Sequence, residues 1–460
     1  MRIRIFGHFA SSALLVLYLL EATALIGTAL LIFGLRGAVL AEPGTWVHAV
    51  LLAGLIQLAM IALGLYSPRQ RDRSAGLALR VTIAVACGVV GAITIALIWR
   101  DIGLFPRRLA FAGLCSWPVI LFIHVLMIHF AERRLFRKPV LVYGAGQRAA
   151  GIARLRRRAD KRGFRVVGYL PGDTAAVEVP ENLVLRGAAP LLDVVRSYKA
   201  EEIVVAMDER RQSFPVDEML QCRLAGTEIS ELMDFLERET GKLPVDALSP
   251  GWLIFGGGFR SHLPGRIAGR AFDLVTASCL LLLASPFMLL TVIAIKLEEG
   301  WRAPVLYRQA RVGLGERIFS VLKFRSMRTD AEAAGEAVWA QKNDNRITRV
   351  GLVIRRFRID ELPQIVNVLR GEMRFVGPRP ERPEFVAQLT QSIPYYRARH
   401  YVKPGITGWA QLCYPYGASE QDALEKLQYD LYYVKHRSLL FDLLILLQTV
   451  EVILLSRGAR

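Results

Sequence analysis

Four long apolar stretches near the N-terminus constrain the fold of this chain more than any other feature. Each is close to the ~20 residues that an α-helix needs to cross a bilayer, and together they cover residues 9–33, 45–66, 78–99 and 109–130. The first is too long for the apolar region of a cleavable signal peptide. Glu21 is the one charged residue deep inside a stretch, which argues against an ion or proton pathway. The sequence therefore predicts a four-helix transmembrane anchor over residues 1–135.

The basic residues of the loops set the orientation of this anchor. The N-terminus, the loop after the second stretch and the segment after the fourth carry Arg2, Arg4, Arg69, Arg71, Arg73, Arg133, Arg134, Arg137 and Lys138. Loops rich in arginine and lysine stay on the cytoplasmic side. We therefore expect a multi-pass protein whose N-terminus, and whose whole chain after residue 131, face the cytoplasm.

The chain is both apolar and basic, with 53% hydrophobic residues and a net charge of +18. Nucleic-acid binding is one source of such a charge, but no zinc-finger, homeodomain or RNP-type pattern is present, so we expect no nucleic-acid partner. Anionic membrane lipids and phosphate-bearing substrates account better for arginines that lie beside apolar segments. The five cysteines are scattered without a CxxC pair and predict neither a disulfide framework nor a metal site.

A fifth apolar segment, residues 272–296, carries Ser285 and Pro286 at its centre. Pro286 removes a helical hydrogen bond, and Ser285 can satisfy backbone groups that the proline frees. Basic residues flank both ends, namely Arg260, Arg266, Arg270, Lys296 and Arg302. A re-entrant helix over 270–297, entering and leaving on the cytoplasmic face, fits these charges better than a proline-kinked span, which stays the alternative.

The C-terminal run 438–456 is apolar but is interrupted by Asp442, Gln448 and Glu451. Such a pattern predicts a helix that lies at the membrane interface.

Residues 136–255 are soluble in character and begin with a strand–glycine–helix pattern. The apolar run 140–143 precedes Gly144 and Gly146, as in dinucleotide-binding folds. Further apolar runs, at 165–170 and 202–206, predict parallel strands, so we expect a Rossmann-like α/β domain. Gly144 and Gly146 are candidates for a nucleotide loop, but a lone GxGxxA turn is a weak signal. The nearest acidic residue, Asp173, follows a Pro-Gly turn, so a regulatory or structural role is as well supported.

Two adjacent carboxylates, Asp360 and Glu361, stand at an expected helix start. Asp360 is a favourable N-cap residue, and Pro363 is tolerated in a first helical turn. For an isolated pair a helix cap is the simpler interpretation. Basic motifs surround this pair, however, and their candidate phosphate-binding residues are Lys323, Arg325, Arg355 and Arg379.

These residue types suit phosphoryl transfer. A carboxylate can attack phosphorus and form an acyl phosphate. The approach of two anions requires arginines and a divalent cation to neutralise the diphosphate. Magnesium prefers one or two carboxylates together with substrate phosphate oxygens. Asp360 as nucleophile and Glu361 as Mg²⁺ ligand form a coherent division of labour, although the sequence alone does not assign which is which.

The region from about residue 270 to the C-terminus resembles the bacterial sugar transferase family, the polyprenyl-phosphate phosphoglycosyl transferases. The resemblance rests on KFRSM, RIDELPQ, VGPRPE and VKPGITGWAQ, and on the Ser285-Pro286 pair. The whole chain is similar to the long form with four N-terminal transmembrane helices, whose members initiate exopolysaccharide or O-antigen synthesis. The segments 414–419 and 426–433 are similar to the subgroup associated with exosortase-type exopolysaccharide loci. Arg358 departs from the family pattern, which often has a small hydroxyl residue there.

The resemblance implies that a UDP-sugar and undecaprenyl phosphate give undecaprenyl-diphosphate-sugar and UMP at a bacterial inner membrane. Asp360 would attack the sugar-proximal phosphate, Glu361 would hold Mg²⁺, and Lys323, Arg355 and Arg379 would engage phosphates. The expected fold is a membrane α-helical N-terminal bundle, a Rossmann-like α/β middle domain, and an α/β catalytic domain (266–460) with a re-entrant membrane helix. The sugar and the oligomeric state, a homodimer included, stay open.

Two other function classes stay open on the sequence. A membrane-anchored nucleotide-sugar oxidoreductase or dehydratase would use the glycine turn, but the middle domain has no Tyr-x-x-x-Lys pair. A non-enzymatic regulator of polysaccharide assembly would use the basic clusters only to bind lipid headgroups. Replacing Asp360 would then leave its function intact.

Overall fold

The computed structural model describes residues 2–5, 8–35, 43–66, 74–98, 105–132, 137–155, 160, 163–172, 177–187, 189–209, 214–248, 257–259, 263–328, 346–414 and 419–454. The chain divides into two compact units, residues 1–241 and 242–460. Several residues used above lie outside the described ones: Arg69, Arg71, Arg73, Arg133, Arg134, Asp173 and Arg260.

The first unit begins with a short hairpin and four apolar helices. The strands are β1 (Arg2–Ile5) and β2 (His8–Ser11), and the helices are α1 (Ser12–Leu35), α2 (Pro43–Ala62), α3 (Ser74–Ile98) and α4 (Pro106–Glu132). All four helices contain stretches long and apolar enough to cross a membrane. Each predicted span is therefore confirmed as a helix. Large apolar side chains such as Leu31, Val90 and Phe122 are exposed on the bundle, as expected for surfaces solvated by lipid.

Glu21 is buried inside the bundle and is hydrogen-bonded on both carboxylate oxygens. It accepts from the Tyr66 hydroxyl, and its Oε1 lies 2.8 Å from His124 Nδ1. An isolated carboxylate is costly in an apolar interior, so these contacts explain how α1 tolerates it and how it joins α1 to α4.

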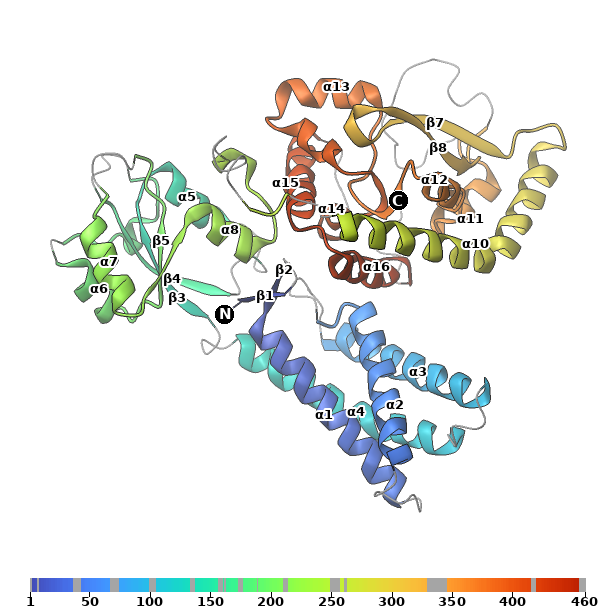
Figure 1. Cartoon of the computed structure of the whole chain (residues 1–460), viewed down its shortest axis with the longest axis horizontal. Coiled ribbons are helices and arrows are strands. Elements are labelled where there is room, and N and C mark those ends of the chain that lie inside the picture. The colour runs from blue at the N-terminus through green and yellow to red at the C-terminus, as the bar shows by residue number, and fades with distance from the viewer. Residues whose placement is uncertain are drawn as a thin grey trace. The chain divides into compact units, whose positions relative to one another are not determined.

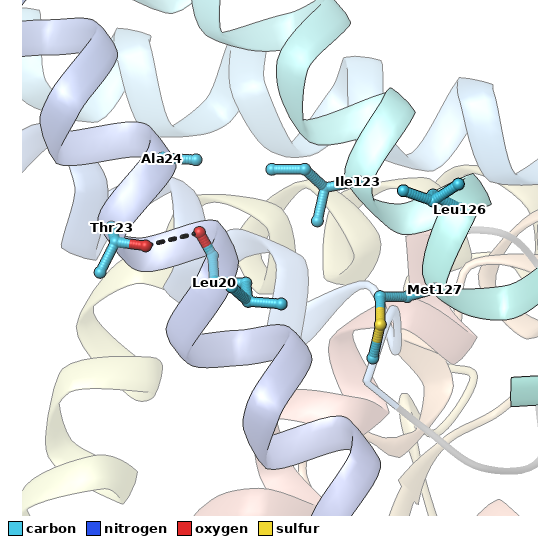
Figure 2. A pocket seen from close by; sticks show the side chains of 6 residues that line it. All are labelled: Leu20, Thr23, Ala24, Ile123, Leu126 and Met127. Atoms are coloured by element: carbon cyan, nitrogen blue, oxygen red, sulfur yellow. Dashed lines mark hydrogen bonds between the residues drawn. The ribbon is translucent and has the colours of Figure 1, made fainter. Parts of the chain in front are cut away.

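An apolar cavity of about 440 Å³ lies between α1 and α4 (Figure 2). It is lined by Leu20, Thr23, Ala24, Ile123, Leu126 and Met127. The Thr23 hydroxyl donates to the Leu20 carbonyl at 2.9 Å. None of the lining residues is titratable, so the cavity has no group for acid–base or nucleophilic chemistry.

The rest of the first unit is a parallel sheet with helices on both faces. The strands β3 (Lys138–Tyr143), β4 (Phe164–Leu170), β5 (Glu202–Val205) and β6 (Glu228–Glu231) lie in the order β4-β3-β5-β6. Alternate residues of β3 face opposite sides. Val140 and Val142 pack with α5 (Gln147–Ala153) and α8 (Leu232–Thr240), and Leu141 packs with α6 (Leu191–Ser197) and α7 (Val216–Leu224) (Figure 1). The predicted parallel α/β arrangement is confirmed.

The second unit is built around one long apolar helix, α10 (Leu263–Glu299), which contains Pro286. The helix is continuous through the proline, and its axis changes direction between its two halves (Figure 1). The Ser285 hydroxyl donates to the Leu282 carbonyl at 2.8 Å, as expected of a serine that satisfies backbone groups beside a proline.

Two small sheets and a set of helices complete the second unit. An antiparallel hairpin joins β7 (Leu306–Val312) to β8 (Ile318–Phe324), and β9 (Arg374–Val376) pairs in parallel with β10 (Gly405–Thr407). The helices are α11 (Arg349–Arg356), η7 (Ile359–Glu361), α12 (Gln364–Arg370), α13 (Pro383–Ser392), η8 (Tyr396–Tyr401), α14 (Trp409–Cys413), α15 (Glu420–His436) and α16 (Leu439–Leu454).

Asp442 shows how one polar interruption of α16 is used. It is buried, its Oδ2 accepts from Arg374 of β9 at 3.0 Å, and its Oδ1 accepts from the Tyr433 hydroxyl at 2.7 Å. The face of α16 that carries Asp442 is therefore packed against β9 and α15.

Candidate active site

Asp360 and Glu361 lie in the 3-10 turn η7 between α11 and α12. Arg358 precedes this turn in the left-handed conformation, with φ 58°. The expectation that Asp360 caps the following helix is wrong, because α12 begins at Gln364 and the cap position, Pro363, makes no side-chain bond. The competing 3-10 turn holds Asp360 one turn before α12. Its side chain is buried, at 8% exposure, and within the described residues its Oδ1 has no hydrogen-bond partner.

Three cations surround the carboxylate of Glu361. Arg379 donates to its Oε1 at 3.2 Å, Arg358 Nη1 lies 3.5 Å from the same oxygen, and Lys323 Nζ lies 3.8 Å from it. Burial alone raises the pKa of Glu361, but the cations, Arg379 first, outweigh it and bring the pKa to about 2. Glu361 is thus a permanently charged anion near neutral pH.

The pKa of Asp360 moves the other way. Burial raises it, the neighbouring charge of Glu361 raises it further, and Lys323 and Arg355 oppose the shift. Two carboxylates side by side do not ionise independently. The environment therefore separates them into a fixed anion, Glu361, and a buried Asp360 whose pKa is shifted upward.

Lys323 is placed by strand β8, and β8 is held by Asn367 of α12. Asn367 Oδ1 accepts from the Leu322 amide at 3.1 Å, and its Nδ2 donates to the Ser320 carbonyl at 2.8 Å. Burial lowers the pKa of Lys323, which the charge of Glu361 counters. The side chain of Asn367 in α12 therefore fixes the position of β8, the strand that carries Lys323.

The loop that carries Arg379 is held through its backbone carbonyls. Arg399 donates to the Arg379 carbonyl at 2.9 Å, and Arg311 donates to the Pro380 carbonyl at 3.0 Å. The Tyr433 hydroxyl oxygen, which donates to Asp442, also lies 3.0 Å from the Val376 carbonyl oxygen. With two prolines in the same loop, these contacts leave Arg379 little freedom to leave Glu361.

The four predicted phosphate-binding cations do not all gather at the carboxylate pair. Lys323 and Arg379 contact Glu361, and the charge of Arg355 acts on Asp360. Arg325 lies just beyond β8, donates to the Pro304 carbonyl at 3.0 Å and is close to the charge of Glu299. Its described contacts are therefore with the end of α10 and the turn after it.

The backbone amides that follow the glycine turn of the first unit are already hydrogen-bonded to a side chain of the same protein. Asp208 accepts from the Gln147 and Arg148 amides, at 2.9 and 2.8 Å, at the start of α5. A pyrophosphate would use these amides in a dinucleotide-binding fold. A side chain at Gly144 would meet the Ala206 carbonyl oxygen at 2.4 Å, so close strand packing explains that glycine.

The oxygen donors of the carboxylate pair fit a magnesium ion. Asp360 Oδ1 is a buried carboxylate oxygen for which the described part of the chain provides no hydrogen-bond partner, and Glu361 is ionised beside it. Magnesium takes one or two carboxylates and completes its shell with substrate and water oxygens. No cluster of three or more His, Cys, Asp or Glu side chains suited to a metal is found among the residues with described positions. An all-protein metal cage is therefore not the arrangement seen in this part of the chain.

Comparison with known proteins places this site within a family. The sequence model of the bacterial sugar transferase family matches residues 265–456, from α10 to α16. A UDP-glucose:undecaprenyl-phosphate glucose-1-phosphate transferase of Klebsiella pneumoniae is 42% identical over 334 residues, which is 69% of this chain and 68% of that protein. The chain belongs to the bacterial sugar transferase family. The membership includes the segment that carries Asp360 and Glu361.

Two other relatives show how far the similarity extends. A protein of the same name from Xanthomonas campestris pv. campestris is 28% identical over 496 residues, covering 99% of this chain and 96% of the relative. A UDP-N-acetylgalactosamine-undecaprenyl-phosphate N-acetylgalactosaminephosphotransferase of Aeromonas hydrophila is 43% identical over 245 residues, 53% of this chain. The chain spans 56% of the length of that relative. Similarity therefore extends over nearly the whole chain in one relative and over about half of it in another.

Sequence reasoning did not identify the buried polar residues that hold the elements of this site in place. Asn367, Arg399 and Asp430 are all buried, and Arg399 Nη2 lies 2.8 Å from Asp430 Oδ2. Polar residues inside otherwise apolar helical runs, as Asn367 is between Val366 and Val368, were the available signal, since such residues need partners when buried.

Proposed function

We propose that the protein transfers a sugar-1-phosphate from a UDP-sugar to undecaprenyl phosphate and releases UMP. The observation that carries the proposal is the buried Asp360 Oδ1, which has no hydrogen-bond partner among the described residues and lies next to Glu361 and the cations Lys323 and Arg379. The names of the relatives support the same reaction class. The site thus combines a nucleophile with cations that bind phosphate oxygens.

The proposed reaction has two displacements at phosphorus. The Asp360 carboxylate attacks the sugar-proximal phosphorus, the bond to the bridging oxygen breaks, and UMP leaves with that oxygen. An oxygen of undecaprenyl phosphate then attacks the same phosphorus and expels Asp360. Each step exchanges one P–O bond for another, so no proton acceptor of high basicity is needed. Covalent catalysis of this kind replaces one encounter of two anionic substrates by two separate steps.

The residues around Asp360 have distinct parts in this proposal. Lys323 and Arg379 neutralise the diphosphate as charge moves onto the leaving UMP. Arg355 favours the ionised form of Asp360, because its charge lowers that pKa. Glu361 and Asp360 would hold Mg²⁺, which supplies positive charge to the diphosphate when bound.

The membrane setting follows from the same proposal. The acceptor is a lipid and the donor is soluble, so the site has to lie at a bilayer surface. We propose the cytoplasmic face of a bacterial inner membrane, with α10 re-entrant. Single cysteines at Gly265 and Arg302, in a background without native cysteines, should react with an impermeant reagent from the same side. Reaction from opposite sides would show that α10 crosses the bilayer.

Turnover in lipid tests the activity itself. Purified protein with undecaprenyl phosphate, Mg²⁺ and UDP-glucose, UDP-galactose or UDP-N-acetylgalactosamine is expected to release UMP and form a lipid-extractable sugar with at least one donor. EDTA should stop both. If none of the three donors yields UMP or lipid-linked sugar, the proposal fails for these donors.

A further inference from the structure

The long helix α10 contacts the elements on both sides of the carboxylate pair. Its N-terminal arm, residues 263–284, and its C-terminal arm, residues 287–299, lie on either side of Ser285-Pro286. The two arms run in different directions (Figure 1). Both arms make polar contacts with the part of the fold that holds Asp360 and Glu361.

The N-terminal arm binds the end of α12 and the start of β9. Arg270 donates to the carbonyls of Val368 and Leu369, at 2.7 and 2.8 Å, in the last turn of α12. Asp273 Oδ2 accepts from Arg374 Nε at 2.8 Å. Arg270 at the C-terminus of α12 and the buried ion pair between Asp273 and Arg374 therefore fix α12 and β9, the elements that follow η7 in the chain.

The C-terminal arm binds the helix that precedes the carboxylate pair. Glu298 Oε1 accepts from the Arg349 amide at 2.8 Å, and Oε2 accepts from the Val350 amide at 2.9 Å. Thr348 accepts from the Gly351 amide at 2.9 Å. The first three amides of α11 therefore all have acceptors, two of them supplied by the long apolar helix.

Apolar packing continues the same contact up to the carboxylates. Ile295 of the C-terminal arm forms a core with Phe324 and Ile354, against which Ile359 and Leu362 pack. Ile359 and Leu362 are the residues on either side of Asp360 and Glu361. The arm thus reaches the pair through α11 and through its immediate chain neighbours.

The shortness of α11 makes the Glu298 contact important. It has eight residues, and isolated helices of this length are not stable in water. A carboxylate at the N-terminus stabilises such a helix by hydrogen bonds and by the helix dipole. Removing the Glu298 carboxylate would leave Thr348 as the remaining described side-chain acceptor at the N-terminus of α11. The segment that leads through Arg355 to Asp360 would then be held less firmly.

We propose that Glu298 is a positioning residue for the transfer reaction, acting through α11 to hold Asp360 in place. The inference rests on the proposed function, since it takes Asp360 as the nucleophile. It gives α10 a part in catalysis besides anchoring. It also couples the conformation of the apolar helix to the geometry of the carboxylate pair, because the two arms hold α11 and α12 separately.

The test compares Glu298→Ala and Glu298→Gln with the matched control Glu299→Gln one residue away, in the full-length protein in lipid. UMP release gives kcat and the KM for UDP-sugar, and hydrogen–deuterium exchange reports on residues 349–362 independently of activity. We expect Glu298→Ala to lower kcat about 5- to 30-fold. This is the fold-change that corresponds to losing the stabilisation of one or two hydrogen bonds at the N-terminus of α11. KM should change less than about 2-fold, because uniform binding is not touched.

The remaining readouts separate positioning from a general loss of structure. Glu298→Gln keeps one acceptor oxygen, so its kcat should lie between those of wild type and Glu298→Ala. Exchange over 349–362 should rise in the Glu298 variants only. Wild-type kcat in Glu298→Ala, equal losses in Glu299→Gln, or unchanged exchange would each overturn the inference. A wild type that releases no UMP would overturn the proposed function instead, and the exchange experiment would still decide whether Glu298 holds α11.

Discussion

Replacing Asn367 by alanine tests whether α12 holds the strand that carries Lys323. Asn367 is fully buried, and its side chain is hydrogen-bonded to the Leu322 amide (3.1 Å), the Ser320 carbonyl (2.8 Å) and Glu372 Oε2 (2.7 Å). The buried Leu322 amide would be left unpaired, at ~1–3 kcal/mol, and the two other partners would lose ~1 kcal/mol each. We therefore expect a destabilisation of about 3–5 kcal/mol.

The melting temperature of the second unit, measured in the full-length protein, reports this loss. For a domain of this size, 1 kcal/mol corresponds to ~2–4 °C, so Asn367→Ala should melt ~6–20 °C lower. Gln391→Ala is the control, because Gln391 is an exposed amide on α13. A fall in melting temperature of less than about 2 °C, or one equal to that of the control, would refute the claim that Asn367 holds β8 to α12.

Further predictions concern a buried carboxylate and the glycine turn. Burial raises the pKa of Asp430 to about 6 despite Arg399, so the folded protein binds this proton more tightly than the unfolded chain does, and the free energy of unfolding should fall as pH rises from about 4 to 6. Asp430→Asn should remove that slope in denaturant titrations; an unchanged slope would contradict the shift. Because Asp208 occupies the first amides of α5, NADH should not raise the melting temperature of the protein. Asp208→Ala should cost about 1 kcal/mol in unfolding, and a clear NADH-dependent shift in the wild type would show that this interpretation is wrong.

The parts of the fold that depend on local patterns could be read from the sequence. Apolar length predicted α1 to α4, and the runs before Gly144 and at 202–206 predicted parallel strands, because both signals lie within about twenty residues. Helix capping at Asp360 was predicted on equally local grounds and is wrong. Arg358 in the left-handed conformation starts a separate turn, and a propensity for N-caps says nothing about such a competitor.

The support of the site could not be read in this way, because its partners are far apart in the chain. Arg374 meets Asp273 and Asp442 across 101 and 68 residues. Asp442 was taken only as a polar interruption of an apolar run, which is all that a one-dimensional pattern shows. Arg325 is close to Lys323 in the sequence, yet β8 ends at Phe324 and Arg325 Nε donates to the Pro304 carbonyl, a contact that local spacing does not reveal.

The most direct test of the account is whether Asp360 becomes covalently attached to the substrate. Purified protein is incubated with UDP-sugar and Mg²⁺ without any lipid acceptor and is then analysed by intact-protein mass spectrometry. We expect a mass increase equal to one phosphosugar in the wild type, its absence in Asp360→Asn, and its loss on addition of undecaprenyl phosphate. An unmodified wild type that still turns over with both substrates present, or equal modification of Asp360→Asn, would contradict it.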